Sequence, residues 1–465
     1  MPDAFEGLAS GERAPGAAVS RLTDLGNAER LVRLHGCDLR FVRGVGWLVW
    51  DGRRWRRDQD GEVERRQKRS VRAMYSEVSA IEDPDERKRL AAFATRSESE
   101  ARIRAAISLA ESERAVVART DELDGDAWLL NVANGVVDLR SGELREHSRE
   151  DLMTKLAPTV YDSSAHSSLW ESFVERCTGG DAELAAFLGR AVGYSLTGST
   201  REEVLFFAHG PTATGKSTFL EAFKAALGDY ARTADFESFL SRSGDAGIRN
   251  DIARLAGARL VVSVEVDEGK RLAEGLLKML TGGDTVTARY LYSEAFEFQP
   301  AFKLWLAANA RPRVNAGDEA MWRRILQVPF LVTIPPSERD PDLKRRLRVE
   351  PEHQSAILAW AVRGCLDWQE HGLAVPQSVA DYTAEYRSEN DPLREFVEAC
   401  CQLGAGATVT ASDLRSAYER WASENGERPI GNTAYGAALK ARGCERVSLS
   451  RGVRGWSGIA VRVQA

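Results

Sequence analysis

The sequence contains no long apolar segment and no secretion signal. Its longest apolar runs have the length of β-strands, whereas a membrane-spanning helix needs about 20 apolar residues. Residues 1–20 include acidic residues, glycines and prolines without an apolar core, so we expect a disordered lead-in and not a signal peptide. These absences predict a cytoplasmic protein that makes no contact with a membrane.

Cysteine is scarce, and its spacing argues against a metal site or a disulfide framework. The six cysteines include no Cys-x-x-Cys pair, and only Cys400 and Cys401 are adjacent. Adjacent residues on a helix point to different sides, so a structural zinc site is not expected. We interpret the cysteines as reduced thiols of a cytosolic protein, because disulfides belong mainly to secreted proteins.

The chain also lacks an overall positive charge. Its 63 Lys and Arg residues are outnumbered by 69 Asp and Glu residues, which gives a net charge of −6. This excludes a basic coat over the whole surface, but not local basic surfaces, because affinity for nucleic acid depends on how charge is distributed. The length of 465 residues is enough for about three domains of roughly 150 residues each.

The residue patterns predict three domains after the lead-in. Residues 21–200 begin with a Trp-rich β-hairpin at 47–55 and continue with a charged helical section at 62–119. Residues 201–375 alternate apolar runs with helices, which is typical of a parallel sheet buried on both faces. Residues 391–465 predict helices followed by two strands. The predicted fold class is an α/β core with an α+β amino-terminal domain.

A phosphate-binding loop is predicted at residues 210–218. Gly210-Pro-Thr-Ala-Thr-Gly215-Lys216-Ser217 fits the GxxxxGK[ST] motif, with an apolar strand predicted before it and an amphipathic helix after it. Backbone N–H groups can turn toward phosphate oxygens there, Lys216 supplies positive charge, and the Ser217 hydroxyl can bind Mg²⁺. A chance glycine loop would not explain both flanks. The residues expected to hold ATP are Gly210, Pro211, Thr212, Ala213, Thr214, Gly215, Lys216, Ser217 and Thr218.

Further candidate catalytic residues follow two other apolar strands. The run at 259–264 ends in Glu265, Asp267 and Glu268, where ATPases need one acid for Mg²⁺ and another to polarise water. We place Asp267 with Ser217 at the metal, although the residues alone do not apportion the roles and a solvated strand end is the alternative. The run at 302–308 ends in Asn309, which can orient the attacking water or terminate the strand.

An arginine pair completes the set of candidate catalytic residues. Either Arg323 or Arg324 could act as an arginine finger at a neighbouring subunit's nucleotide. The alternative is that both arginines merely solvate the start of a strand. The sequence does not choose between the two arginines.

The order of these features resembles superfamily 3 helicases, a branch of the AAA+ ATPases. More specifically, the chain resembles the phage and plasmid primase-helicase family, which includes poxvirus primase-helicases. The resemblance covers nearly the whole chain from about residue 20. The stretches that carry it are 24–30, 50–55, 131–139, 280–290, 296–309 and 322–325.

The resemblance implies a hexameric DNA helicase that moves 3′ to 5′ along single strands by hydrolysing ATP. It implies a role in replicating a phage or mobile element in the bacterial cytoplasm, with single-stranded and forked DNA as substrates. Related proteins often carry an amino-terminal primase domain, which we do not expect in this chain, so a separate primase or polymerase is an expected partner. The family's loop commonly has Asn where this chain has Thr214; ATP binding should survive, because the backbone cradles the phosphates.

DNA contacts are expected at two places. The resemblance implies a channel hairpin at 285–299, near which Lys278, Arg289 and Tyr292 suit phosphate contact and base stacking. Residues 408–465 contain nine Lys and Arg against five Asp and Glu, a net charge of +4, and predict a winged helix. Its expected DNA-binding residues are Lys440, Arg442, Arg451 and Arg454.

Three alternatives remain, one for the winged helix and two for the function of the whole chain. A winged helix can mediate protein contact instead of DNA contact, and a P-loop ATPase can remodel proteins or act as a regulatory switch. A primase with an unrecognised catalytic site is a third, weaker alternative. Stimulation of ATP hydrolysis by single-stranded DNA would distinguish the helicase from the protein remodeller.

Overall fold

The computed structural model describes residues 21–241, 250–264, 270–289, 295–315, 317–425 and 429–462. The chain forms two compact units, which are described separately. The first consists of residues up to Gly125 together with His147–Lys155, and the second of Asp126–Glu146 and all residues from Leu156 onward. No helix in the described ranges is long and apolar enough to cross a membrane.

The first unit combines a small sheet with four helices. The sheet order is β3-β2-β1-β4, and Trp50 pairs with Trp55 across β2 and β3, which confirms the predicted Trp-rich hairpin. One apolar core lies around Leu31, Leu39 and Val49. The elements are α1 (Asp24–His35), β1 (Leu39–Val42), β2 (Gly46–Trp50), β3 (Trp55–Arg57), α2 (Glu62–Ala80), α3 (Pro84–Ser97), α4 (Glu100–Ala110) and β4 (Val117–Ala118).

A five-stranded sheet forms the centre of the second unit. Its order is β14-β8-β13-β10-β9, and every neighbouring pair is parallel. The three predicted apolar strands are confirmed to within one residue as β8, β10 and β13, whereas the two edge strands were not predicted. The strands are β8 (Leu205–His209), β9 (Ala231–Thr233), β10 (Leu260–Val264), β13 (Lys303–Ala308) and β14 (Ile325–Pro329).

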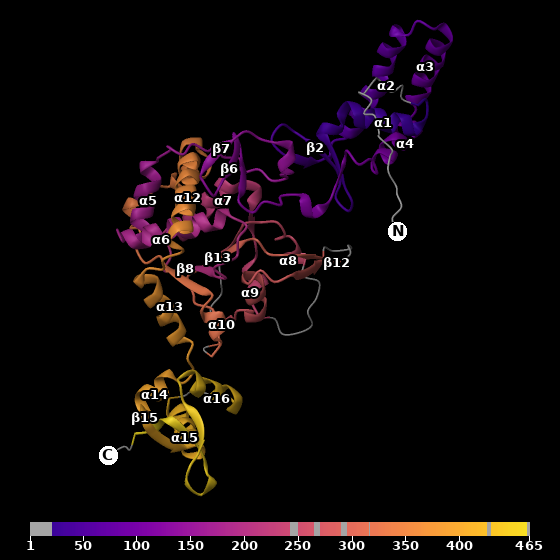
Figure 1. The fold of residues 1–465 in the computed structure, drawn as a ribbon. Helices are drawn as coiled ribbons and strands as arrows, with labels where there is room; N and C mark the ends of the chain where they lie inside the picture. The colour runs from indigo at the N-terminus through magenta and orange to yellow at the C-terminus, as the bar shows by residue number, and fades with distance from the viewer. Residues whose placement is uncertain are drawn as a thin grey trace, which may run out of the picture. The chain divides into compact units, whose positions relative to one another are not determined.

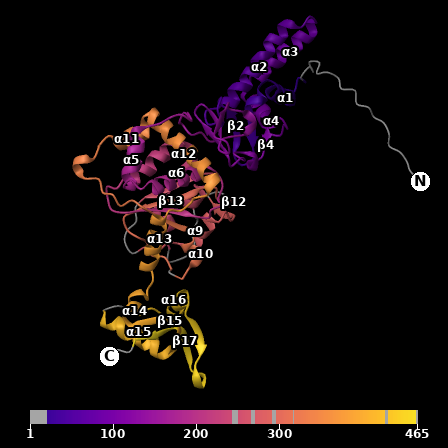
Figure 2. The same cartoon turned by 60° about the vertical axis from the view of Figure 1, so that its left-hand side comes forward.

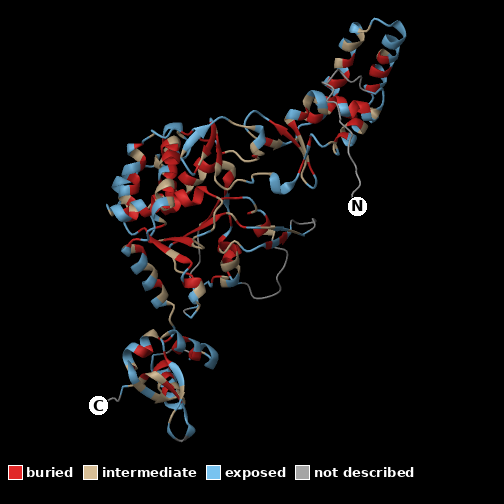
Figure 3. Ribbon diagram, in the orientation of Figure 1, coloured by how far each residue is buried: buried red, intermediate tan, exposed pale blue. Residues whose placement is uncertain are grey.

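Both faces of this sheet are buried, as the continuous apolar runs require. Phe206 and Trp305 belong to the core on one face, whereas Phe207 and Leu306 belong to the core on the other. Figures 1 and 2 show the helices gathered on the two sides of the sheet, and Figure 3 shows the buried residues concentrated in its strands. The main helices are α5 (Ser168–Thr178), α6 (Ala182–Leu196), α7 (Lys216–Leu227), α9 (Glu274–Thr281), α11 (Leu343–Val349), α12 (Pro351–His371) and α13 (Gln377–Glu389).

The boundary between the units differs from the domain boundary predicted at residue 200. Helices α5 and α6 belong to the second unit, because Trp170 and Phe187 pack in the same core as Phe206 of the sheet. A three-stranded sheet of β5 (Leu129–Val132), β6 (Gly135–Asp138) and β7 (Glu143–Arg145) also belongs to the second unit. The sequence gives no sign of this division, because the contacts join segments far apart in the chain.

An antiparallel hairpin lies between β10 and β13 in the chain. Val286 pairs with Phe298 and Arg289 with Ala295, so the two predicted strands of the hairpin at 285–299 are confirmed as β11 (Val286–Arg289) and β12 (Ala295–Phe298). Its tip, residues 290–294, lies outside the described residues.

The carboxy-terminal residues form helices followed by a strand pair, as predicted. The predicted helices include α15 and α16, and the two predicted strands correspond to β16 and β17. Helix α14 and strand β15 were not predicted; β15 adds a third strand in the order β15-β17-β16. The elements are α14 (Arg394–Cys400), β15 (Cys401–Thr410), α15 (Ala411–Glu424), α16 (Asn432–Ala441), β16 (Glu445–Ser448) and β17 (Arg454–Val461).

Candidate functional site

The predicted phosphate loop connects strand β8, which lies between β14 and β13 in the sheet, to helix α7. Gly210 has φ 152° and Gly215 has φ 91°, a backbone region that favours glycine. A Cβ atom would lie 1.9 Å from the carbonyl oxygen of Phe330 at Gly210, and 2.4 Å from Sγ of Cys177 at Gly215. Glycine is therefore required at both motif positions by conformation and by space.

The Lys216 side chain folds back over the loop. Its Nζ donates to the carbonyl oxygens of Gly210 and Pro211 at 2.7 and 2.6 Å, and to Oγ1 of Thr214 at 3.2 Å. The side chain is buried, and burial lowers the pKa of the ammonium to about 8. No carboxylate neutralises this cation in the described contacts, so a phosphate group would find a largely desolvated positive charge.

A cavity of about 670 Å³ opens at the carboxyl edge of the parallel sheet, beside the loop. Ligands of open α/β sheets bind at this edge. The cavity brings together Lys216, Ser217 and Asn309, three of the predicted site residues. The residues lining it are Lys216, Ser217, Glu221, Thr233, Ala234, Asp235, Phe236, Glu237, Leu240, Val264, Lys270, Ala307, Ala308 and Asn309.

The predicted acids Glu265, Asp267 and Glu268 lie outside the described residues. Val264, which directly precedes them, lines the cavity. Three acids that sequence reasoning missed also line it: Glu221 on α7, and Asp235 and Glu237. The last two follow the short strand β9, whose three residues give too little periodicity to reveal a sheet edge.

A second cavity, of about 470 Å³, adjoins the same loop at Ala213, Gly215 and Thr218. Much of its wall is apolar, with Phe173 of α5 and Ile334 among the lining residues. The backbone N–H of Ile334 donates to the carbonyl oxygen of Ala213 at 2.9 Å. The loop thus lies between two cavities, of which the second has the more apolar wall.

A partly buried polar cluster that includes His209, the residue before the loop, was also missed by sequence reasoning. Nδ1 of His209, the last residue of β8, lies 2.7 Å from the Tyr382 hydroxyl on α13. Burial, with Arg311 and Lys216 nearby, lowers the pKa of His209 to about 4. The Arg311 guanidinium lies 4.6 Å from the Tyr382 ring and 3.0 Å from Glu385. These contacts join the segment after Asn309 to α13.

The two candidate finger arginines have different surroundings. Arg324 is buried, with Nη2 2.6 Å from Oε2 of Glu203 and Nη1 donating to the Ala320 carbonyl. The side chain of Arg323 is 68% exposed and lies 3.9 Å from Glu203. Both precede Ile325, which pairs with Leu205 at the amino end of β8. They therefore lie at the opposite edge of the sheet from the phosphate loop.

The candidate DNA-binding residues differ in whether they are exposed to solvent or held in ion pairs. Lys278 pairs with Asp318 at 2.8 Å, whereas Arg289 is exposed at the end of β11; Tyr292 lies outside the described residues. Lys440 and Arg454 are exposed, but Arg442 is largely buried against Asp391, with which it forms an ion pair. For Arg451 only the backbone, in a 3₁₀ turn at Ser450–Gly452, is described.

Comparison with protein families gives two matches. Residues 28–179 match the family model described as D5 N terminal like, and residues 208–324 match that of a family of unknown function (DUF5906). The second match includes the phosphate loop, β10, β13 and the arginine pair.

Helicase-named viral proteins are among the relatives of the chain. "Putative helicase L207/L206" of Acanthamoeba polyphaga mimivirus is 27% identical over 295 residues, which cover 59% of this chain and 30% of that protein. "Putative helicase 022R" of Frog virus 3 (isolate Goorha) is 26% identical over 424 residues, which cover 73% of this chain and 43% of that protein. The chain thus spans less than half the length of these relatives.

The apo structure of the NrS-1 C terminal region (305–718) is among the solved structures similar to the chain. Its TM-score is 0.39 at 11% identity, covering 69% of this chain and 88% of that one; a TM-score below 0.5 does not establish a shared fold. The class defined here is a mixed α/β protein with a phosphate-loop sequence at the carboxyl edge of a parallel sheet. By its two partial family matches and these relatives, the chain is similar to viral proteins named as putative helicases.

Proposed function

We propose that the chain is an ATP-hydrolysing DNA helicase of the AAA+, superfamily 3 type, acting in the replication of a phage or virus. The observation that carries the proposal is the cavity that unites Lys216, Ser217 and Asn309 at the carboxyl edge of the sheet. A cation, a hydroxyl and an amide at one such edge suit the phosphates, the Mg²⁺ ion and the attacking water of ATP hydrolysis.

The residues present fit ATP and Mg²⁺. Lys216 and the loop N–H groups would hold the β- and γ-phosphates, while the Ser217 hydroxyl would hold Mg²⁺. The apolar cavity beside Phe173 would take the base. Bound Mg²⁺ would neutralise negative charge on the transferring phosphoryl group. The acids after Val264 would hold the Mg²⁺ ion and orient the attacking water.

The position of Arg323 supports a ring with shared active sites. Its exposed guanidinium lies at the amino edge of the sheet, while the phosphate loop lies at the carboxyl edge of the same chain. The strand between them spans about 13 Å at ~3.3 Å per residue. Arg323 therefore suits the nucleotide of a neighbouring subunit, as an arginine finger supplied in trans. Arg324, held by Glu203, has a structural role.

The proposed substrate is single-stranded and forked DNA, with 3′ to 5′ movement of a hexamer. Helicase-named relatives and the exposed Arg289 on the β11–β12 hairpin support this substrate. The helix order and three-stranded sheet of residues 391–465 support a winged helix, with Lys440 and Arg454 available for phosphate contact. A separate primase or polymerase is the proposed partner.

Strand displacement tests the proposal. The chain should unwind a forked duplex with a 3′ single-stranded tail when ATP and Mg²⁺ are present, and single-stranded DNA should stimulate ATP hydrolysis. The Lys216→Ala variant serves as the inactive control. Hydrolysis that does not respond to DNA, together with no unwinding, would favour the alternative of a protein remodeller or regulatory switch.

A further inference from the structure

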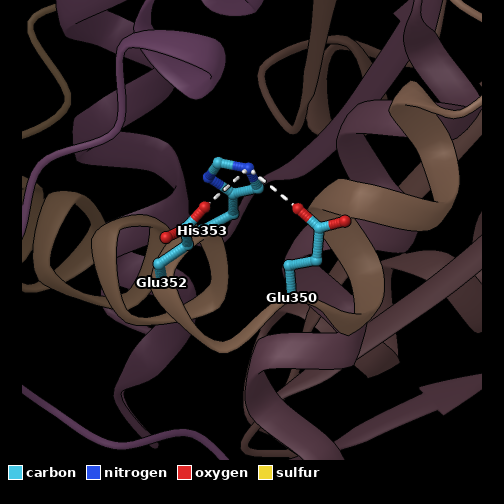
Figure 4. A group of neighbouring side chains, drawn as sticks. All are labelled: Glu350, Glu352 and His353. Atoms are coloured by element: carbon cyan, nitrogen blue, oxygen red, sulfur yellow. Dashed lines mark ion pairs between the residues drawn. The ribbon is translucent and has the colours of Figure 1, made fainter.

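Two carboxylates and an imidazole meet at the start of helix α12, away from the phosphate loop motif. Glu350 is the residue before the helix, and Glu352 and His353 lie in its first turn. Nε2 of His353 is 3.3 Å from Oε2 of Glu350 and 3.6 Å from Oε1 of Glu352. Figure 4 shows both carboxylates pointing toward the ring from opposite sides.

The His353 ring is buried, yet its Nε2 lacks a hydrogen bond. The side chain is only 9% exposed, and Nε2 is a buried atom whose contacts with the two carboxylates do not have hydrogen-bond geometry. Buried polar atoms are nearly always satisfied, so an exception needs an explanation. An atom or ion between Nε2 and the carboxylates would provide it.

The other ring nitrogen has the partner that a metal-binding histidine requires. Nδ1 lies 3.0 Å from Oγ of Ser167, which caps helix α5 by accepting from the Trp170 N–H. When Nδ1 carries the proton and donates it to Ser167, Nε2 keeps a lone pair that can bind an ion. An oxygen partner on the second nitrogen orients most metal-bound histidines.

We propose that Glu350, Glu352 and His353 form a binding site for a divalent transition-metal ion, of which Zn²⁺ is the type. A tetrahedral ion with bonds of about 2.0–2.1 Å holds neighbouring ligand atoms about 3.3–3.4 Å apart. The contacts of Nε2 with Glu350 and Glu352, at 3.3 and 3.6 Å, are close to this spacing, and all three ligand atoms lie within 4.8 Å of one another. Water would complete the coordination.

The ligand chemistry selects the class of ion. Mg²⁺ and Ca²⁺ prefer sites made of oxygen alone, whereas an imidazole suits Zn²⁺ and its neighbours in the first transition series. The amino end of a helix also favours negatively charged groups, which suits a pair of carboxylate ligands. Two carboxylates facing one imidazole therefore leave a negative site for a divalent ion to neutralise.

The ion would join two helices that support the phosphate loop. It would hold the first turn of α12 and, through His353 and Ser167, the amino end of α5. Further along α5, Phe173 and Cys177 lie against Gly215, where an added Cβ would come within 3.1 Å of Phe173. The proposed site is thus structural, and its existence does not depend on the helicase function.

Metal titration of the full chain tests the proposal. The nucleotide-free protein, stripped with a chelator, is titrated with Zn²⁺ by calorimetry and with Co²⁺ by absorption spectroscopy. We expect one tight site, a Co²⁺ spectrum without thiolate charge transfer, and no competition from Mg²⁺ at equal concentration. Glu352→Gln should weaken Zn²⁺ binding roughly tenfold or more. Because the Glu352 side chain is 75% exposed, this replacement should not disturb folding, so the weaker binding would report the loss of a ligand.

A matched control comes from a second histidine–glutamate pair. His166 lies 3.1 Å from Glu171, but both side chains are exposed, and this pair is not among the three-ligand groups of the described residues. Glu171→Gln should leave Zn²⁺ affinity unchanged. The proposal is overturned if wild type does not bind Zn²⁺, if Glu352→Gln binds it as tightly as wild type, or if the Co²⁺ spectrum shows thiolate ligands.

Discussion

Glu203 holds Arg324 by an ion pair of 2.6 Å, while the adjacent Arg323 extends into solvent with 68% of its side chain exposed. Burial and distance thus distinguish two arginines that the sequence leaves equivalent. Arg324 is committed to the interior of its own subunit. Arg323 also lies 3.9 Å from Glu203, but its exposed side chain can extend toward a neighbouring subunit.

Replacing Arg323 should therefore affect ATP hydrolysis, whereas replacing Arg324 should affect the stability of the fold. Arg323→Ala should lower the rate of ATP hydrolysis by roughly 10³- to 10⁵-fold, the range for arginine fingers, without lowering the thermal unfolding midpoint. Arg324→Ala should lower that midpoint, because it removes charged hydrogen bonds that contribute about 1.5–3 kcal/mol each. Steady-state hydrolysis and thermal denaturation measure the two effects. Equal loss of stability in both variants would contradict the assignment.

Mixing experiments test whether Arg323 acts in trans. Mixed rings of Arg323→Ala and Lys216→Ala subunits contain some interfaces with one intact loop and one intact arginine. We expect these rings to recover part of the hydrolysis that each variant lacks alone. Native mass spectrometry verifies that the rings are mixed. Mixed rings without any recovery would assign Arg323 to its own subunit or to a structural role.

The carboxy-terminal segment should bind duplex DNA through few phosphate contacts. Lys440 and Arg454 are exposed, and each lost contact should flatten the plot of log affinity against log salt by about 0.9. Replacing both by Ala should flatten it by up to about two units while hydrolysis without DNA persists. Arg442→Ala, which breaks the pair with Asp391, should affect folding more than the salt slope. An unchanged slope after the double replacement would favour a protein-docking role.

Much of the core was predictable because its signals are local. Apolar runs identified β8, β10 and β13, and the phosphate-loop motif identified residues that line one cavity. The edge strands β9 and β14 were missed because the first is short and the second contains the buried polar residue Gln327. The His209–Tyr382 contact and the Glu203–Arg324 pair join residues more than 100 positions apart. Periodicity cannot report such contacts.

Lys216 is both the cation of the phosphate loop and a hydrogen-bond donor within it. Its Nζ donates to the carbonyl oxygens of Gly210 and Pro211, so Lys216→Ala removes these contacts together with the charge. Lys216→Ala should still abolish hydrolysis, because no other described cation lies on the loop. Lys88→Ala, at an exposed lysine of α3, is the matched control. Hydrolysis near the wild-type rate in Lys216→Ala would refute the site.

The lowered pKa of Lys216 predicts that ATP affinity falls as pH rises. Burial brings this pKa from 10.5 to about 8 in the free protein, so the ammonium is charged at pH 7 and increasingly neutral above pH 8. A bound phosphate favours the charged form and raises the pKa again, so binding near pH 9 must take up a proton. Calorimetry in buffers of different ionisation enthalpy measures that uptake. Because Lys216→Ala removes the titrating group, it should show neither the uptake nor the fall in affinity between pH 7 and 9.5; proton uptake that persists in this variant would assign the pH dependence to another group.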